Sequence, residues 1–206
     1  MNYYIDFDST LYETAKLTEL MLKAIGKKIG ELAKLDAEPL IKDAIDNFKS
    51  STDNIFTHAE NMGEKYNVDK CAVVSAVKAV LNNGKEIVYE DTVRFLKKLK
   101  EKGHRIYMLT FIYPGNQEYQ MQKILGSELA QYFDVLIITT ERKYSLDIDY
   151  ENGIFIDDNP KDLTGLYERK PLRLIRMRRP NNKRSNIEMD IKEIEEVASF
   201  DEINID

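Results

Sequence analysis

The chain has 206 residues, of which 43% are hydrophobic and 32% charged, a balance typical of a folded globular protein. Its formal net charge of −6 argues against a general nucleic-acid binder, because such proteins usually carry an excess of basic residues. Cys71 is the single cysteine, which excludes a disulfide framework and a cysteine-based metal site.

The sequence has no basic N-terminal segment followed by an apolar stretch, and no run approaches about 18 apolar residues. We therefore expect neither a signal peptide nor a membrane span, no membrane partner, and a cytoplasmic location. At this length, one domain that carries an insertion is the expected organisation.

The apolar run that ends at Ile5 predicts a short strand, and Asp6 and Asp8 follow directly after it. Side chains two residues apart point to the same side of a strand, so the two carboxylates would lie roughly 7 Å apart. Acidic residues are unfavourable in strands. Their placement indicates a functional site, whereas the plainer alternative is that the acidic and hydroxyl residues only turn the chain.

After Thr10 the pattern becomes helical. Apolar residues at spacings of three and four predict four helices, over residues 17–32, 39–48, 55–62 and 69–81. Pro39 suits the first turn of the second helix, and the polar cluster 50–54 ends that helix and caps the third. We therefore expect an all-α insertion over residues 13–86.

Beyond residue 86, helices and strands alternate. Asp91 is placed to cap a helix that Gly103 ends. Strands are expected over 105–110, 134–138, 153–156 and 172–175, and a helix over 117–131. This alternation predicts a parallel sheet with helices on both faces. We interpret the basic run 173–184 as a solvated surface beyond an edge strand, with an anionic substrate or partner as the alternative.

Polar residues stand where the expected strands end. Asp6 and Asp8 end the first strand, Thr110 the second, and Asp157 and Asp158 the fourth. Ligands of parallel α/β sheets bind beyond the carboxyl ends of the strands, so we expect these side chains to converge. Four converging carboxylates call for a cation, and an all-oxygen set suits Mg²⁺ when a phosphate completes the coordination.

The other residues fit a phosphate as well. The Thr110 hydroxyl and a cation, either Lys143 or its neighbour Arg142, could hold phosphate oxygens. An aspartate can act as a nucleophile and form an aspartyl-phosphate. A second carboxyl group two residues along the chain could protonate the leaving group and then activate water.

Four segments resemble the four motifs of the haloacid dehalogenase-like hydrolase superfamily, in the expected order. They are residues 6–11, Leu109-Thr110, Lys143, and residues 156–162. The resemblance implies an α/β fold with a three-layer, Rossmann-like parallel sheet core. It also implies a core domain made of residues 1–12 and 87–206, and a helical cap domain made of residues 13–86.

The resemblance also implies roles for individual residues. Asp6 would be the nucleophile and Asp8 the general acid and base, while Thr110 and Lys143 would bind the phosphoryl group. Mg²⁺ would be held by the Asp6 side chain, the backbone carbonyl of Asp8, and Asp158, with Asp157 close by. Two positions depart from the family pattern: Tyr144, rather than proline, follows Lys143, and Phe111 stands where asparagine is common.

Asp8 favours phosphoryl transfer over carbon–halogen cleavage, because the dehalogenase members of the family lack this residue. We therefore expect a Mg²⁺-dependent phosphatase that acts on a small phosphorylated metabolite, such as a nucleotide or a sugar phosphate. The alternative is a non-catalytic member that binds a phosphate-bearing ligand or a protein partner.

Overall fold

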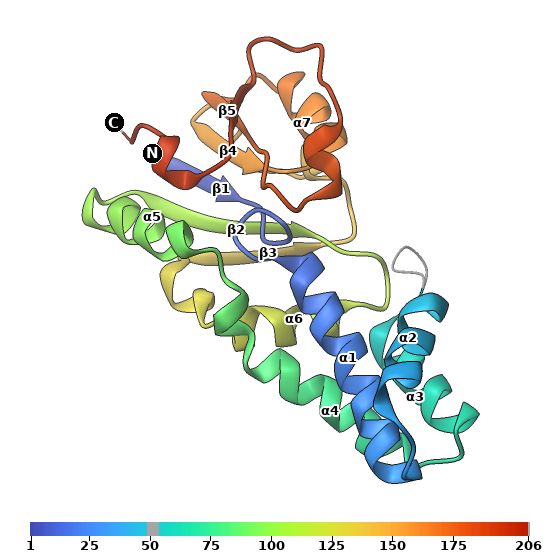
Figure 1. Cartoon of the computed structure of the whole chain (residues 1–206). Helices are drawn as coiled ribbons and strands as arrows, with labels where there is room; N and C mark the ends of the chain where they lie inside the picture. Colours follow the sequence, from blue (N-terminus) through green and yellow to red (C-terminus); the bar gives the residue numbers. More distant parts are fainter. Residues whose placement is uncertain (49–53, 206) are drawn as a thin grey trace.

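The computed structural model describes residues 1–48 and 54–205. Within these ranges the chain forms a parallel sheet of six strands in the order β3-β2-β1-β4-β5-β6, which confirms the predicted fold class (Figure 1). The strands are β1 Asn2–Ile5, β2 Arg105–Phe111, β3 Val135–Thr139, β4 Gly153–Asp157, β5 Arg173–Met177 and β6 Glu195–Val197. Predicted strands are confirmed to within one or two residues, but β6 was not predicted, because three residues that include two glutamates carry no strand pattern.

The described helices are α1 Thr14–Ala33, α2 Ala37–Asn47, α3 Ile55–Lys65, α4 Lys70–Asn82, α5 Glu90–Glu101, α6 Gln117–Gly126 and α7 Pro160–Tyr167. Short 3-10 helices also occur: η1 Gly84–Ile87, η2 Leu129–Tyr132, η3 Lys143–Ser145, η4 Lys183–Asn186 and η5 Phe200–Glu202. No helix of the described ranges is long and apolar enough to cross a membrane.

The sheet is the middle layer of three. Successive strand residues point to opposite faces, so Tyr3 belongs to the core that contains Phe95 of α5, with which its ring is in contact, whereas Tyr4 belongs to the core that contains Leu163 of α7. Both cores are buried, and Figure 1 shows α5 and α6 on one side of the sheet and α7 on the other. Helices α1 to α4 extend from the end of the sheet at which the strands finish (Figure 1).

Three helices of the insertion, α2, α3 and α4, begin at polar capping residues. The side chains of Asp36, Asn54 and Asp69 accept hydrogen bonds from backbone N–H groups in the first turns of α2, α3 and α4. Asn54 thus confirms part of the predicted capping cluster, and residues 50–53 of that cluster lie outside the described ranges. The predicted cap at Asp91 is wrong: α5 already begins at Glu90, and the buried Asp91 side chain binds Arg179.

The helix predicted over 117–131 is shorter than expected. Helix α6 ends at Gly126, where α4 approaches so closely that a Cβ atom on this residue would lie 1.8 Å from the Leu81 carbonyl oxygen. Glycine lets the two backbones approach, and the chain then continues as the short helix η2.

The basic run 173–184 is only partly a solvated surface: Lys183 and Arg184 are exposed, whereas Arg176 and Arg179 are buried, and the expectation of an edge strand is wrong. Strand β5 lies between β4 and β6, and Arg176 is fully buried beside Glu196 of the unexpected strand. Arg179 is 4% exposed, lies over the Tyr89 ring at 4.1 Å, and donates two hydrogen bonds to Asp91, at 2.7 and 2.9 Å. Burial of both arginines is offset by carboxylates and carbonyl oxygens, which accept from Nη1 and Nη2 of Arg176 and from the Arg179 guanidinium group.

Candidate active site

Asp6 and Asp8 lie in the loop that follows β1. The Asp6 N–H still donates to the Ile156 carbonyl oxygen of β4 at 2.9 Å, which fixes the first acid at the strand end. The loop then turns through Ser9, whose φ of 62° lies in the left-handed region. The Thr10 hydroxyl donates back to Asp6 Oδ2 at 3.3 Å. The two carboxylates that the sequence placed on one side of a strand therefore stand in a tight turn and have different partners.

Lys143 contacts the Asp6 carboxylate directly. Its Nζ atom lies 2.5 Å from Asp6 Oδ1 and 2.6 Å from Asp157 Oδ2, and all three side chains are buried. Burial alone would lower the pKa of this ammonium, but Asp157 and Asp6 raise it above its ordinary value. Of the two cations that the sequence offered, Lys143 is the one that reaches Asp6.

Arg142 lies further out. Its guanidinium group lies 4.7 Å from the centre of the Phe111 ring, and its Nη1 atom lies 3.7 Å from Asp162 Oδ1. Asp162 is held through its other oxygen, because Asn159 Nδ2 donates to Asp162 Oδ2 at 2.6 Å. Asn159 also caps α7, and together these contacts hold the segment that follows Asp158.

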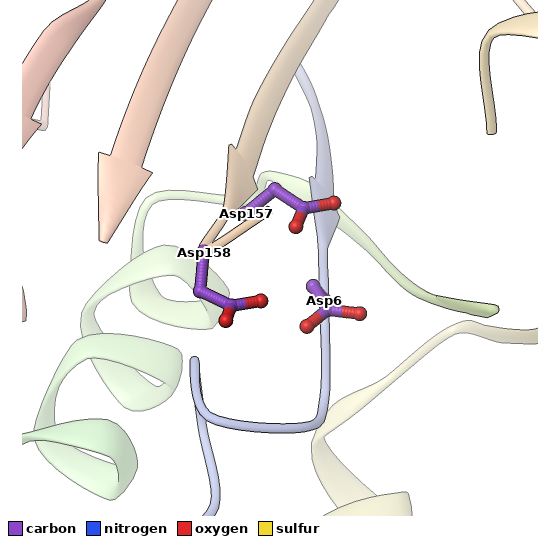
Figure 2. A group of neighbouring side chains, drawn as sticks. All are labelled: Asp6, Asp157 and Asp158. Carbon is purple, nitrogen blue, oxygen red and sulfur yellow. The ribbon is translucent and has the colours of Figure 1, made fainter. Parts of the chain in front are cut away.

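Three buried carboxylates meet at the ends of β1 and β4. Asp6, Asp157 and Asp158 each present an oxygen, and these oxygens lie within 4.8 Å of one another (Figure 2). Burial and the neighbouring carboxylates of Asp157 and Asp158 raise the pKa of Asp6 well above its ordinary value, even though Lys143 opposes the shift. Burial and Asp157 raise the pKa of Asp158 to about 6. The raised pKa values of Asp6 and Asp158 indicate that the neighbouring cations do not fully offset the negative charge of the three carboxylates.

The segment after β5 closes this cluster. Asn182 Nδ2 donates to Asp158 Oδ2 at 2.6 Å, and Arg184 Nη1 lies 3.1 Å from Asp158 Oδ1. Sequence reasoning did not place these two residues in the site. The basic run was the available signal, but only the fold shows which of its members turns back to the strand ends.

Helix α6 holds the Asp8 carboxylate. Gln120 Nε2 donates to Asp8 Oδ2 at 2.9 Å, and Lys123 Nζ lies 2.5 Å from Asp8 Oδ1, to which the Thr14 hydroxyl donates at 2.7 Å. Burial would raise the pKa of Asp8, but Lys123 and these hydrogen bonds hold it below its ordinary value. Sequence reasoning missed Gln120 and Lys123, although a spacing of three places both on one face of the predicted helix.

Thr110 is buried at the end of β2. Its hydroxyl oxygen accepts a hydrogen bond from the same Gln120 amide, at 3.1 Å. The structure thus brings together all the residues that the sequence proposed, namely Asp6, Asp8, Thr110, Lys143, Asp157 and Asp158. Their roles stay predictions.

A cavity of about 280 Å³ opens beside these groups. Asp6, Asp8 and Lys143 line it from the core, and Phe111 and Tyr113 line it from the segment after β2. The helical insertion contributes Thr18, Phe48 and Ile55 to the same walls. A ligand in this cavity would therefore contact both the acidic cluster and the insertion.

A family model described as haloacid dehalogenase-like hydrolase matches residues 3–166, and no curated protein matches the chain. Among solved structures, a HAD phosphatase from Thermococcus onnurineus has a TM-score of 0.62 at 16% identity, with 98% of this chain and 94% of that chain covered.

Two other solved structures give the same fold. A haloacid dehalogenase-like family hydrolase from Xanthomonas campestris has a TM-score of 0.58 at 15% identity, over 97% of this chain and 91% of that one. CbbY from Rhodobacter sphaeroides, in complex with xylulose-(1,5)bisphosphate, has a TM-score of 0.56 at 15% identity, with 98% of this chain and 95% of that chain covered. The fold and the family match over most of the length show that the chain belongs to the haloacid dehalogenase-like hydrolases.

Proposed function

We propose that the protein is a Mg²⁺-dependent phosphatase that hydrolyses the phosphate monoester of a small metabolite through an aspartyl-phosphate on Asp6. The observation that carries the proposal is the buried cluster of Asp6, Asp157 and Asp158, with the Lys143 ammonium 2.5 Å from Asp6. A nucleophilic carboxylate, a cation and a set of acidic ligands are what phosphoryl transfer to an aspartate requires.

The residues fit a magnesium ion. The three carboxylates present only oxygen atoms, all three residues are buried, and their oxygens lie close enough to share one small cation. In the family pattern the Asp8 backbone carbonyl would be a further ligand. When bound, the ion would offset the mutual repulsion of the acids and the charge on the phosphoryl oxygens.

The first half-reaction transfers the phosphoryl group to the protein. A carboxylate oxygen of Asp6 attacks phosphorus as the bond between phosphorus and the leaving-group oxygen breaks. Asp8 delivers a proton to that oxygen, so the leaving group departs as an alcohol. Lys143, whose Nζ atom contacts Asp6, and the Thr110 hydroxyl, which shares the Gln120 amide with Asp8, hold the non-bridging oxygens.

The second half-reaction restores the protein. Asp8 accepts a proton from a water molecule whose oxygen attacks phosphorus, and the bond between phosphorus and Asp6 breaks. Inorganic phosphate leaves, and the Asp6 carboxylate is free again. Each turnover consumes one water molecule and regenerates both acids.

The size of the cavity supports a small substrate. A volume of about 280 Å³ lies just below the roughly 300–1,000 Å³ that ligand pockets usually span. Because Thr18, Phe48 and Ile55 line it, we infer that residues 13–86 act as a cap that contacts the leaving group and keeps out water. We expect the substrate to be a nucleotide or a sugar phosphate.

The test is phosphate release from 4-nitrophenyl phosphate with and without Mg²⁺. We expect Mg²⁺-dependent turnover that Asp6→Asn abolishes, while the exposed Asp46→Asn serves as a control with unchanged turnover. A panel of nucleotide and sugar phosphates then identifies the leaving group. If the protein binds Mg²⁺ but turns over no phosphoester, the non-catalytic alternative holds. Unchanged activity in Asp6→Asn would refute the proposed mechanism, in which Asp6 is the nucleophile.

A further inference from the structure

The Asp8 carboxylate is surrounded by hydrogen-bond donors. Lys123 Nζ and the Thr14 hydroxyl lie 2.5 and 2.7 Å from Oδ1, and Gln120 Nε2 lies 2.9 Å from Oδ2. An ammonium group and an amide nitrogen can only donate. The contacts therefore suit Asp8 as an acceptor, the state in which it takes a proton from water.

Lys123 is buried beside Asp8. Its side chain is 3% exposed, and its Nζ atom lies 4.8 Å from the centre of the Tyr119 ring and 5.8 Å from that of Phe7. Within the described residues, Asp8 is the carboxylate with which Lys123 forms an ion pair. A lysine removed from water is costly unless its partner is well placed. The pair therefore fixes the carboxylate on the α6 side of the cavity, which Lys123 and Gln120 also line.

We propose that Lys123, assisted by Gln120, is a positioning residue that orients the Asp8 carboxylate for the second half-reaction. The inference rests on the proposed phosphatase function. Asp8 accepts the proton of the attacking water while the bond between phosphorus and Asp6 breaks, and Lys123 keeps the accepting oxygens in place. Without Lys123, transfer to Asp6 continues, but release of the phosphoryl group to water becomes slow.

The test compares Lys123→Met with the wild-type protein on 4-nitrophenyl phosphate. Nitrophenolate leaves without needing a proton, so kcat/KM reports phosphoryl transfer to Asp6, whereas kcat also includes hydrolysis of the intermediate. We expect kcat to fall by about tenfold or more and kcat/KM to change by less than about twofold. An initial burst of nitrophenol approaching about one equivalent of active sites should precede the slow steady state.

Two controls isolate the effect. Lys100→Met removes a lysine that pairs with Asp134 on the surface, and it should leave both kinetic constants unchanged. In an Asp8→Asn background, Lys123→Met should add less than about a twofold change, because residues that act as a unit are not additive. If Lys123→Met does not fold, Lys123→Gln keeps a donor without the charge and should show the same loss of kcat at nearly constant kcat/KM.

The inference is overturned if kcat/KM falls as much as kcat, if no burst appears, or if the two substitutions are additive. Each of these results would give Lys123 a general structural role. Failure of the proposed function is a different result, since it would appear in the wild-type protein as no Mg²⁺-dependent release of nitrophenol at all.

Discussion

Arg179 connects the C-terminal part of the chain to the loop that carries Asp6. Its guanidinium group donates to both oxygens of Asp91 and, at 3.1 Å, to the Thr10 carbonyl oxygen, while the Thr10 hydroxyl donates to Asp6. We predict that Arg179→Met destabilises the protein, because the substitution leaves Asp91 buried without its cation. It should also loosen the loop behind the nucleophile.

The size of the effect follows from the burial of the pair. Removing one partner of a buried ion pair typically costs about 3–5 kcal/mol. Ser199 Oγ and the Phe200 N–H still donate to Asp91, so we expect the lower end, about 3 kcal/mol. One kcal/mol shifts Tm by about 2–4 °C in a protein of this size, which gives a decrease of about 6–12 °C.

Thermal unfolding followed by circular dichroism measures the shift. Arg178→Met is the matched control, because the neighbouring arginine is partly exposed and its pair with Glu196 lies at the surface, so its Tm should stay within about 2 °C of the wild type. Adding Asp91→Leu to Arg179→Met should recover part of the loss, since it removes the unpaired charge. If Arg179→Met melts within about 2 °C of the wild type, the reasoning about this buried pair is wrong.

Two further predictions concern the acidic cluster and the α4–α6 contact. Because burial raises the pKa of Asp158 to about 6, its contribution to stability without metal is present at low pH and is lost as the pH rises through that value. The free energy of unfolding is measured by urea titration in EDTA at about pH 5 and pH 7. Between these pH values it should increase less in the wild type than in Asp158→Asn, and an equal change with pH in the two proteins would contradict this. Gly126→Ala should destabilise the protein by about 2 kcal/mol, because its Cβ would lie 1.8 Å from the Leu81 carbonyl oxygen. Wild-type stability of this variant in the same urea titrations would mean that the two helices can separate at no cost.

Much of the fold could be predicted because its patterns are local. Compact apolar runs predict the strands from β1 to β5, and spacings of three and four predict the helices of the insertion. The parallel sheet then determines where each acid at a strand end lies. The convergence of Asp6, Asp157 and Asp158 could therefore be predicted from the sequence alone.

The rest depends on contacts between distant segments. Asp8 is held by Gln120 and Lys123, more than 110 residues away, and nothing in the loop sequence indicates which face of α6 it meets. Arg176 and Arg179 looked like solvated charges because their partners Glu196 and Asp91 lie on other elements. Whether a charged residue is buried depends on whether the fold supplies a partner for it. Because these partners lie elsewhere in the chain, the sequence of the run alone does not identify them.

Trapping the intermediate tests the central claim most directly. Asp8→Asn protein is mixed with 4-nitrophenyl phosphate and Mg²⁺, quenched with acid within the first turnover, and digested for peptide mass spectrometry. We predict a phosphoryl group on the peptide that contains Asp6, at Asp6 itself, and none in a variant that also carries Asp6→Asn. Turnover by the wild-type protein, with no phosphoryl group found on Asp6 under these conditions, would contradict the account.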